Sequence, residues 1–195
     1  MEVLIIVGVI AAFILIAIFG SLAEKKRREQ LAALALRLGL RFSPARDYSI
    51  PARFVFLKRV AQGSNRYAMH RLQGEWKNRP AEAFTFHYET HSTDSKGRRT
   101  THHHHVGVVL LRIEKVFPEV TIAPEGFLSK IAQAVGYDDI DFESAEFSKR
   151  FYVKSPDRKW AYDVIHARTM EYLLAAPRHS LEFDDRSIIV WNKGR

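Results

Sequence analysis

The chain opens with an unbroken apolar run, which constrains its fold more than any other feature. From Val3 to Phe19 no residue is charged or strongly polar, and the run continues to Leu22. The hydrocarbon core of a bilayer, about 30 Å thick, requires a helix of about 20 mostly apolar residues. A helix that packs on a soluble domain normally keeps a polar face, which this run lacks. The sequence therefore predicts one transmembrane helix within residues 1–23.

Basic residues directly follow the apolar run and predict its orientation. Lys25, Lys26, Arg27 and Arg28 lie on its C-terminal side, while Glu2 is the only charged side chain before it. The positive-inside rule places such a basic flank in the cytoplasm. We therefore expect a single-pass protein of the cell membrane with its N-terminus outside and its soluble domain cytoplasmic. The four basic side chains are expected to contact the anionic membrane surface, which attracts each by about 1 kcal/mol.

A cleaved signal peptide is the rival explanation of the same segment. Ser21, Leu22 and Ala23 could serve as a small-residue cleavage site. Against this explanation, the segment lacks a basic n-region, its apolar run exceeds the usual h-region, and basic residues directly follow the supposed cut. A membrane anchor therefore accounts for the segment better than a signal peptide does.

Composition limits the number of domains and the chemistry. The chain has 195 residues, of which 47% are hydrophobic, and this is enough for one core but little for two. Its net charge of +8 favours contact with anionic surfaces. The absence of cysteine excludes disulfides, thiolate catalysis and cysteine-ligated zinc. Any metal site must therefore use histidines and carboxylates.

Hydrophobic periodicity predicts a helix followed by an α+β domain. Residues 24–41 are rich in Lys, Arg, Ala and Leu, with Leu31, Leu34 and Leu38 at helical spacing, and they predict a basic juxtamembrane helix. Residues 42–195 contain short runs with aromatic and β-branched residues, as in strands, and in the run from Ala83 to Thr90 an aromatic face alternates with a polar one. The predicted fold class is thus α+β: one N-terminal transmembrane helix, then a mostly antiparallel sheet with two or three packed helices.

The same patterns predict the individual elements of residues 42–195. One helix is expected to begin at Pro124 and end near Gly136, and another to begin at Ser155 and run to about Ala175. A turn at residues 184–186 is expected to close a hairpin. The expected strands are Phe54 to Leu57, Tyr67 to Leu72, Ala83 to Thr90, Val106 to Ile113, Val120 to Ile122, Phe147 to Val153, Leu181 to Phe183 and Ser187 to Trp191.

A run of four histidines, His102 to His105, is the most unusual local motif. If the preceding strand turns back so that His87 lies opposite His105, then Glu89 lies opposite His103, and these four side chains share one face. Three imidazoles and a carboxylate within cross-strand reach are a candidate site for Zn²⁺ or Ni²⁺. The histidines could instead sense pH, because imidazoles change charge between about pH 5 and 8. Simple exposure to solvent on a hairpin explains the histidines equally well.

The expected hairpin tip offers an anion-binding candidate. Lys96, Arg98 and Arg99 surround Gly97 and could grip a phosphate group, although many soluble hairpin tips look alike. Elsewhere the sequence contains no Gly-rich phosphate loop, dinucleotide fingerprint, HExxH motif or Gly-x-Ser-x-Gly elbow. An enzyme of a common motif-bearing class is therefore disfavoured, and no specific nucleic-acid partner is predicted.

Several packing and capping residues carry a resemblance to a known class of proteins. They are the turn at Ile122-Ala123-Pro124-Glu125, the segment from Phe147 to Val153, and then Ser155, Asp157, Ala161, Met170 and Leu173. With the N-terminal anchor, they make the chain resemble bacterial single-pass membrane-anchored proteins of unknown function. The resemblance implies an α+β domain on a membrane tether and transfers no catalytic residue.

The anchor, the basic charge and the missing catalytic motifs together predict a function. We expect a membrane-tethered cytoplasmic binding or scaffolding domain that is not an enzyme. Its expected partners are the lipid bilayer and a membrane or cytoplasmic protein. The alternative is a metal-binding or metal- and pH-sensing domain that uses the histidine-rich hairpin.

Overall fold

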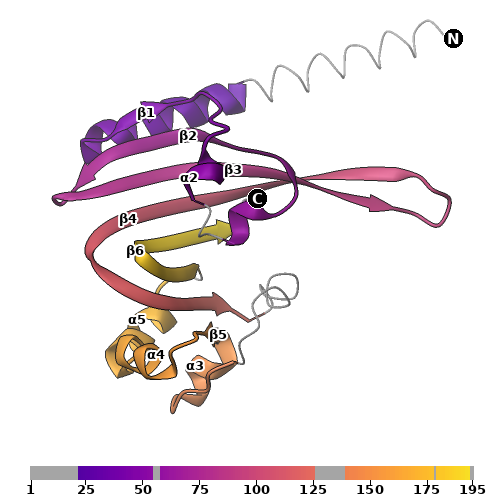
Figure 1. Cartoon of the computed structure of the whole chain (residues 1–195). Coiled ribbons are helices and arrows are strands. Elements are labelled where there is room, and N and C mark those ends of the chain that lie inside the picture. Colours follow the sequence, from indigo (N-terminus) through magenta and orange to yellow (C-terminus); the bar gives the residue numbers. More distant parts are fainter. Residues whose placement is uncertain (1–21, 55–57, 126–138, 178, 194–195) are drawn as a thin grey trace, which may run out of the picture.

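The strands of this protein form one antiparallel sheet. The computed structural model describes residues 22–54, 58–125, 139–177 and 179–193 (Figure 1). The sheet has six strands in the order β1-β2-β3-β4-β5, and β6 pairs with β4. The strands are β1 (Arg41–Ser43), β2 (Ser64–Trp76), β3 (Arg79–Thr93), β4 (Arg99–Pro124), β5 (Phe151–Lys154) and β6 (Ser180–Lys193).

Helices lie at three places around this sheet. A helix over residues 22–38 covers one face of β2 and β3, where Ala35 is buried, and α2 packs near the opposite face (Figure 1). The helices of residues 145–175 gather beside β5, at the far end of the molecule (Figure 1). The bounds of the labelled helices are α2 (Ile50–Arg53), η1 (Lys58–Ala61), α3 (Ala145–Arg150), α4 (Arg158–Val164) and α5 (Ala167–Ala175).

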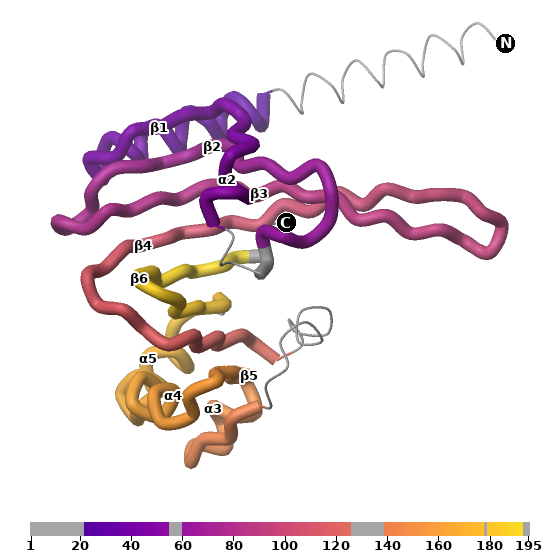
Figure 2. Tube along the Cα trace, viewed as in Figure 1, coloured from indigo at the N-terminus to yellow at the C-terminus, as the bar shows by residue number. Residues whose placement is uncertain are grey.

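β4 is the longest strand and pairs with three others. Its middle section lies between β3 and β6, since Val108 is opposite both Phe84 and Trp191. Its last residues pair with β5 and with the beginning of β6. The pairing with β6 is irregular between Arg112 and Val120, and irregular pairing lets a strand bend. Figure 2 shows β4 curving so that its two ends lie in different parts of the molecule.

The bend of β4 separates two hydrophobic cores. Each fully buried large side chain contributes about 1.5–3 kcal/mol relative to its exposed state. The first core lies between the sheet and α2 and contains Ile50, Phe54, Val60, Ala68, Phe84, Phe86, Val108, Leu110, Ile189 and Trp191. The second lies between the end of β4, β5 and the last helices and contains Val120, Ile122, Ile140, Phe147, Phe151, Val153, Ala161, Ile165 and Leu173.

The transmembrane part of the predicted fold class is corrected by the structure. Among the described residues, none of the helices is both long and apolar enough to cross a membrane. The helix over residues 22–38 carries charged residues from Glu24 to Glu29 and packs on the sheet. Most of the predicted segment, Val3 to Leu22, lies outside the described residues. What the structure shows is an α+β fold with a mostly antiparallel sheet and several helices.

The prediction of one helix from Ser155 to Ala175 is wrong. The backbone leaves the helical conformation at Ile165 (φ −100°, ψ 60°) and His166 (φ −80°, ψ 172°), so α4 ends there and α5 begins after them. The N-cap of α4 is Asp157, whose carboxylate accepts a hydrogen bond from the main-chain N–H of Trp160 at 2.9 Å. The Ser155 hydroxyl instead donates to a main-chain carbonyl of β4 at 2.7 Å.

The predicted closing hairpin is also wrong. Its two segments form the single strand β6, and both pair with β4. They join at Asp185, whose φ of 50° lies in the left-handed region, so β6 bends together with β4. A period-2 pattern shows which side chains share a face but does not identify the partner strand.

The strand predicted from Phe147 to Val153 begins too early. Residues up to Arg150 belong to α3, because the Ser144 hydroxyl caps this helix by accepting a hydrogen bond from the Phe147 N–H at 3.2 Å. β5 starts only at Phe151. The predicted helix from Pro124 and the predicted strand from Phe54 fall mainly on residues 126–138 and 55–57, which lie outside the described residues.

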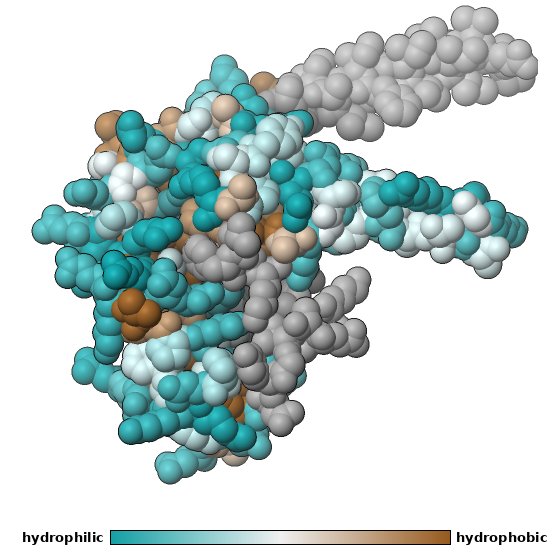
Figure 3. Space-filling view, in the orientation of Figure 1, coloured by the Kyte–Doolittle hydropathy of each residue, from teal (hydrophilic) through white to brown (hydrophobic). Residues whose placement is uncertain are grey.

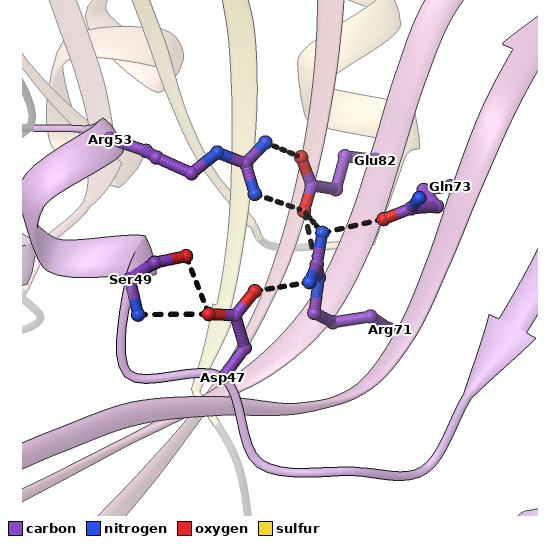
Figure 4. A network of polar contacts seen from close by, with 6 residues as sticks. All are labelled: Asp47, Ser49, Arg53, Arg71, Gln73 and Glu82. Atoms are coloured by element: carbon purple, nitrogen blue, oxygen red, sulfur yellow. Dashed lines mark hydrogen bonds and ion pairs between the residues drawn. The ribbon is translucent and has the colours of Figure 1, made fainter.

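A network of charged side chains holds α2 and the preceding loop on the sheet (Figure 4). Arg71 on β2 pairs with Asp47 and donates through Nε to Oε1 of Glu82 on β3 at 3.0 Å. Arg53 on α2 donates through Nη2 to the other Glu82 oxygen at 2.9 Å. Side-chain exposure is only 16% for Arg71, 19% for Asp47 and 10% for Glu82. Two guanidinium groups thus neutralise two carboxylates where water is largely excluded.

Replacing Arg71 should destabilise the protein far more than replacing Arg53. Arg71→Ala leaves two poorly hydrated carboxylates without their shared partner and should lower the free energy of unfolding by about 3 kcal/mol. Arg53→Ala is the matched control. The Arg53 side chain is 45% exposed, so its removal should lower the free energy of unfolding by no more than about 1 kcal/mol. Urea denaturation followed by the fluorescence of buried Trp191 measures both. Equal effects would contradict the structural role assigned to Arg71.

Asp47 should make stability depend on acidic pH. Burial raises the pKa of Asp47, but hydrogen bonds from Ser49 and the charges of Arg71 and Arg53 outweigh burial, and the pKa is lowered overall. Because the folded-state pKa lies below the unfolded one, Asp47 stabilises the fold above about pH 4 and loses this contribution as pH falls through the folded-state pKa. Asp47→Asn should therefore flatten the fall of the unfolding free energy below about pH 4. The control Asp163→Asn, at an exposed position, should leave the fall of the unfolding free energy below about pH 4 unchanged.

Candidate functional site

The histidine-rich hairpin pairs in the register that the metal hypothesis assumed. His87 lies opposite His105, and Glu89 lies opposite His103. Since successive side chains of a strand point to opposite faces, these four residues share one face of the β3–β4 pair. That face is the one covered in part by the helix over residues 22–38, where Arg27 donates to the hydroxyl of Thr85 at 3.3 Å.

Three of these four side chains bring their ligand atoms together. His87 Nε2 lies 3.3 Å from His103 Nδ1, and His103 Nδ1 lies 3.3 Å from Glu89 Oε1. All three ligand atoms are within 4.8 Å of one another. His87 is 3% exposed, whereas the side chain of His103 is 59% exposed. The cluster therefore has a buried side within the sheet and a side that is open to solvent.

Asn65, which the sequence analysis missed, holds two members of this cluster. Its main-chain carbonyl lies 3.0 Å from His87 Nδ1, and its side-chain amide donates to Glu89 Oε1 at 2.7 Å. Asn65 has a φ of 45°, at an irregularity of β2 that follows Ser64. Asparagine adopts this left-handed conformation more readily than most residues. Only the irregular pairing of β2, which no sequence motif marks, brings Asn65 under the cluster.

Aromatic stacking fixes the ring of His87. Tyr67 is buried and stacks on it with ring centroids 4.5 Å apart and an interplanar angle of 22°. The guanidinium of Arg46 lies over the Tyr67 ring, 4.7 Å from its centroid. The hydrogen bond from Asn65, then the neighbouring His103 and His87, lower the pKa of Glu89. Glu89 is therefore an ionised carboxylate at neutral pH.

His105 lies next to the cluster without joining its three ligand atoms. Its ring centroid is 4.9 Å from that of His87. Burial, followed by the neighbouring charges of His87 and Arg27, lowers the pKa of His105 and favours its neutral form. The predicted role of His105 as a metal ligand stays a prediction, as does the predicted response of the histidines to pH.

The other histidines of the run point to the opposite face of the hairpin. His102 Nε2 is hydrogen-bonded to the Ser92 hydroxyl at 2.9 Å, and His104 Nε2 to the Thr90 hydroxyl at 2.8 Å. The alternation of the strand thus divides the histidine run into two pairs with different neighbours.

At the hairpin tip, the carboxylate of Asp94 already binds groups of the predicted anion site. Asp94 accepts hydrogen bonds from the main-chain N–H groups of Lys96 and Arg98 at 2.9 and 2.8 Å. The Arg98 guanidinium also pairs with Asp94 at 2.8 Å. Binding of an anion by Lys96, Arg98 and Arg99 stays a prediction, and it would have to compete with Asp94 for Arg98.

The four basic residues predicted at the membrane surface begin the helix over residues 22–38 and are all exposed. Glu24 of the same turn is hydrogen-bonded to buried His70 Nε2 at 2.8 Å, which fastens this end of the helix to β2. Arg28 pairs with Glu24 at 2.9 Å, and Lys25 pairs more loosely with Glu29 at 4.0 Å. Contact of these residues with lipid stays a prediction.

Comparison with known proteins supports the fold alone. No family model matches the sequence, and no curated protein matches it. The crystal structure of the mycobacterial trehalose monomycolate transport factor A, TtfA, is similar, with a TM-score of 0.55 and 10% sequence identity. The similarity covers 85% of this chain and 81% of that chain. At such low identity the match shows a shared fold and no shared site.

Proposed function

We propose that this protein is a non-enzymatic binding or scaffolding domain that takes up an extended segment of a partner protein along its β3–β4 hairpin. The hairpin projects well beyond the rest of the sheet (Figure 1). We call residues 90–105 the arm. Pairing of β3 with β2 ends at Glu89, and pairing of β4 with β6 ends at Val106. Both limits coincide with the place where the hairpin leaves the sheet.

The free edges of the arm are the observation that carries this proposal. Within the described ranges, each arm strand is paired on its inner side only, so main-chain N–H and C=O groups face outward along both edges. An exposed edge of this kind can pair with an added strand from another protein. Main-chain hydrogen bonds would provide affinity, and the outward side chains would provide specificity.

The side chains of the arm suit a polar partner segment. The arm surface is mostly hydrophilic (Figure 3). Its serine, threonine and histidine side chains are hydrogen-bonded in pairs across the two strands, for instance His91 Nδ1 with the Thr101 hydroxyl at 3.1 Å. A two-stranded ribbon by itself is marginally stable in water, and a third strand would stabilise it. The mycobacterial protein of similar fold is named a transport factor, and a binding or scaffolding role agrees with that name.

The proposal also includes a location at the cytoplasmic face of the cell membrane. The exposed basic residues Lys25, Lys26, Arg27 and Arg28 support it, because they can approach anionic lipid headgroups. The bilayer and a membrane or cytoplasmic protein are accordingly the proposed partners.

Photocrosslinking tests the role of the arm. A photoreactive amino acid placed at Thr101, in cells that make the full chain, should give a discrete crosslinked product with a partner protein. Position 172 is the matched control, because Tyr172 is 71% exposed but lies far from the arm on α5. In the purified complex, amide hydrogen exchange of the arm should slow if a strand has been added. Crosslinks of equal yield at both positions, or unchanged exchange in the arm, would refute the proposal.

A reporter fused after Arg195 tests the location. A reporter that is active only in the cytoplasm should be active, and the full chain should sediment with membranes. Neutralising the basic cluster with Lys25→Gln and Lys26→Gln should reduce sedimentation with anionic vesicles at low salt, because surface attraction falls with charge. Lys96→Gln together with Arg99→Gln at the hairpin tip serves as the charge-matched control, because it also removes two positive charges. Activity of a reporter that works only outside the cytoplasm would overturn the proposed location.

A further inference from the structure

We propose that His87, Glu89 and His103 bind a divalent transition-metal ion of the Zn²⁺ or Ni²⁺ class at the base of the arm, and that Asn65 positions two of these ligands. The proposal goes beyond the binding of a partner segment. It concerns the face of the hairpin toward which these three side chains point, whereas the strand partner proposed above uses the edges of the arm.

Two of the three distances between the ligand atoms match a metal site. Zinc bonds to nitrogen or oxygen are about 2.0–2.1 Å long, so neighbouring ligand atoms of a tetrahedral site lie about 3.3 Å apart. Both close contacts of His103 Nδ1, with His87 Nε2 and with Glu89 Oε1, measure 3.3 Å. Direct hydrogen bonds between such groups are shorter, most often about 2.9–3.0 Å. The third pair, His87 and Glu89, has its ligand atoms within 4.8 Å, so a small approach of these two side chains would complete the set around an ion.

Asn65 selects the tautomer of His87 that a metal requires. A carbonyl oxygen can only accept a hydrogen bond, so His87 must carry its proton on Nδ1, which faces the Asn65 carbonyl at 3.0 Å. Neutral His87 then has its lone pair on Nε2, the atom that faces His103 and Glu89. Metal-binding histidines almost always donate their second ring N–H to a carbonyl or carboxylate in this way. The Asn65 amide holds the carboxylate of Glu89 through a second hydrogen bond, at 2.7 Å.

The surroundings favour an ion with open coordination positions. Imidazole and carboxylate ligands suit zinc and nickel, and three protein ligands leave room for water or for a side chain of a partner. His87 is buried and stacked on Tyr67, so one ligand is rigid before binding. His103 is exposed, so an ion can enter from solvent.

Two simpler explanations make different predictions. The cluster could be held by hydrogen bonds alone, and then purified protein would bind no metal stoichiometrically. The histidine run could chelate metal through any of its members, and then all four would matter alike. Under our proposal, metal affinity depends on His103 but not on its neighbours His102 and His104, because those two point to the opposite face.

Metal titration of the untagged full chain in mild detergent separates these explanations. Competition between the protein and a chromophoric chelator for Zn²⁺, and then for Ni²⁺, should give one ion per chain. His103→Ala and Glu89→Gln should each weaken binding by more than about 100-fold, the upper end of what loss of a supporting residue costs. His102→Ala and His104→Ala are the matched controls and should leave affinity unchanged. Equal losses in His102→Ala, His103→Ala and His104→Ala, with no loss in Glu89→Gln, would indicate chelation by the run and overturn the site.

Asn65→Gly tests the positioning role. Glycine accepts the left-handed backbone of Asn65 and keeps the carbonyl that faces His87, but it removes the amide that holds Glu89. Affinity should fall by about 10-fold, in the range for supporting residues, while the circular dichroism spectrum stays the same. Co²⁺ bound to the wild-type chain should show the intense visible absorption of a tetrahedral site, and the spectrum should change in Asn65→Gly. An unaltered affinity and Co²⁺ spectrum would refute the role of Asn65, and failure of the wild-type chain to bind any metal would refute the site.

Discussion

Pairing of β4 on both of its edges is the constraint on which the rest of the structure depends. From Val106 to Arg112 this strand is bonded to β6, and up to Leu111 it is also bonded to β3. A strand bonded on both sides cannot slip by one residue without turning its buried side chains to the wrong face. Burial of Val108 and Leu110 in the first core therefore also sets the register farther along the hairpin, where His87 meets His105.

The arm and the histidine cluster arise where this double pairing ends. Beyond Val106 the hairpin has no third strand among the described residues, so its edges are open to a partner. His87 belongs to the buried part of β3 and His103 to the exposed arm, and Glu89 joins them. The cluster thus has one rigid member and one accessible member. A bound ion would join the arm to the sheet at the point where a strand partner would begin to pair.

Local patterns predicted part of this arrangement well. The patterns of residues 83–90 and 106–113 predicted two strands, and the antiparallel register assumed for them, with Glu89 opposite His103, is the one in the structure. The same reasoning failed for residues 181–191, which form one bent strand instead of a hairpin. It failed because Asp184 and Asp185 look like turn residues, while the bend of β4 allows β6 to continue through an irregularity at Asp185.

The sequence by itself determined that His87 shares a face with Glu89, and His103 with His105, because the two-residue period of a strand is a local property. That the two pairs meet on one face depends on the register between β3 and β4, which the structure shows. The sequence also determined, through the absence of cysteine, that any metal site must use such residues. Only the tertiary structure decided that Asn65 lies beneath His87 and Glu89 and that β6 follows β4 through its bend. Both depend on irregular pairing between strands, and that pairing is set by the packing of residues far apart in the chain.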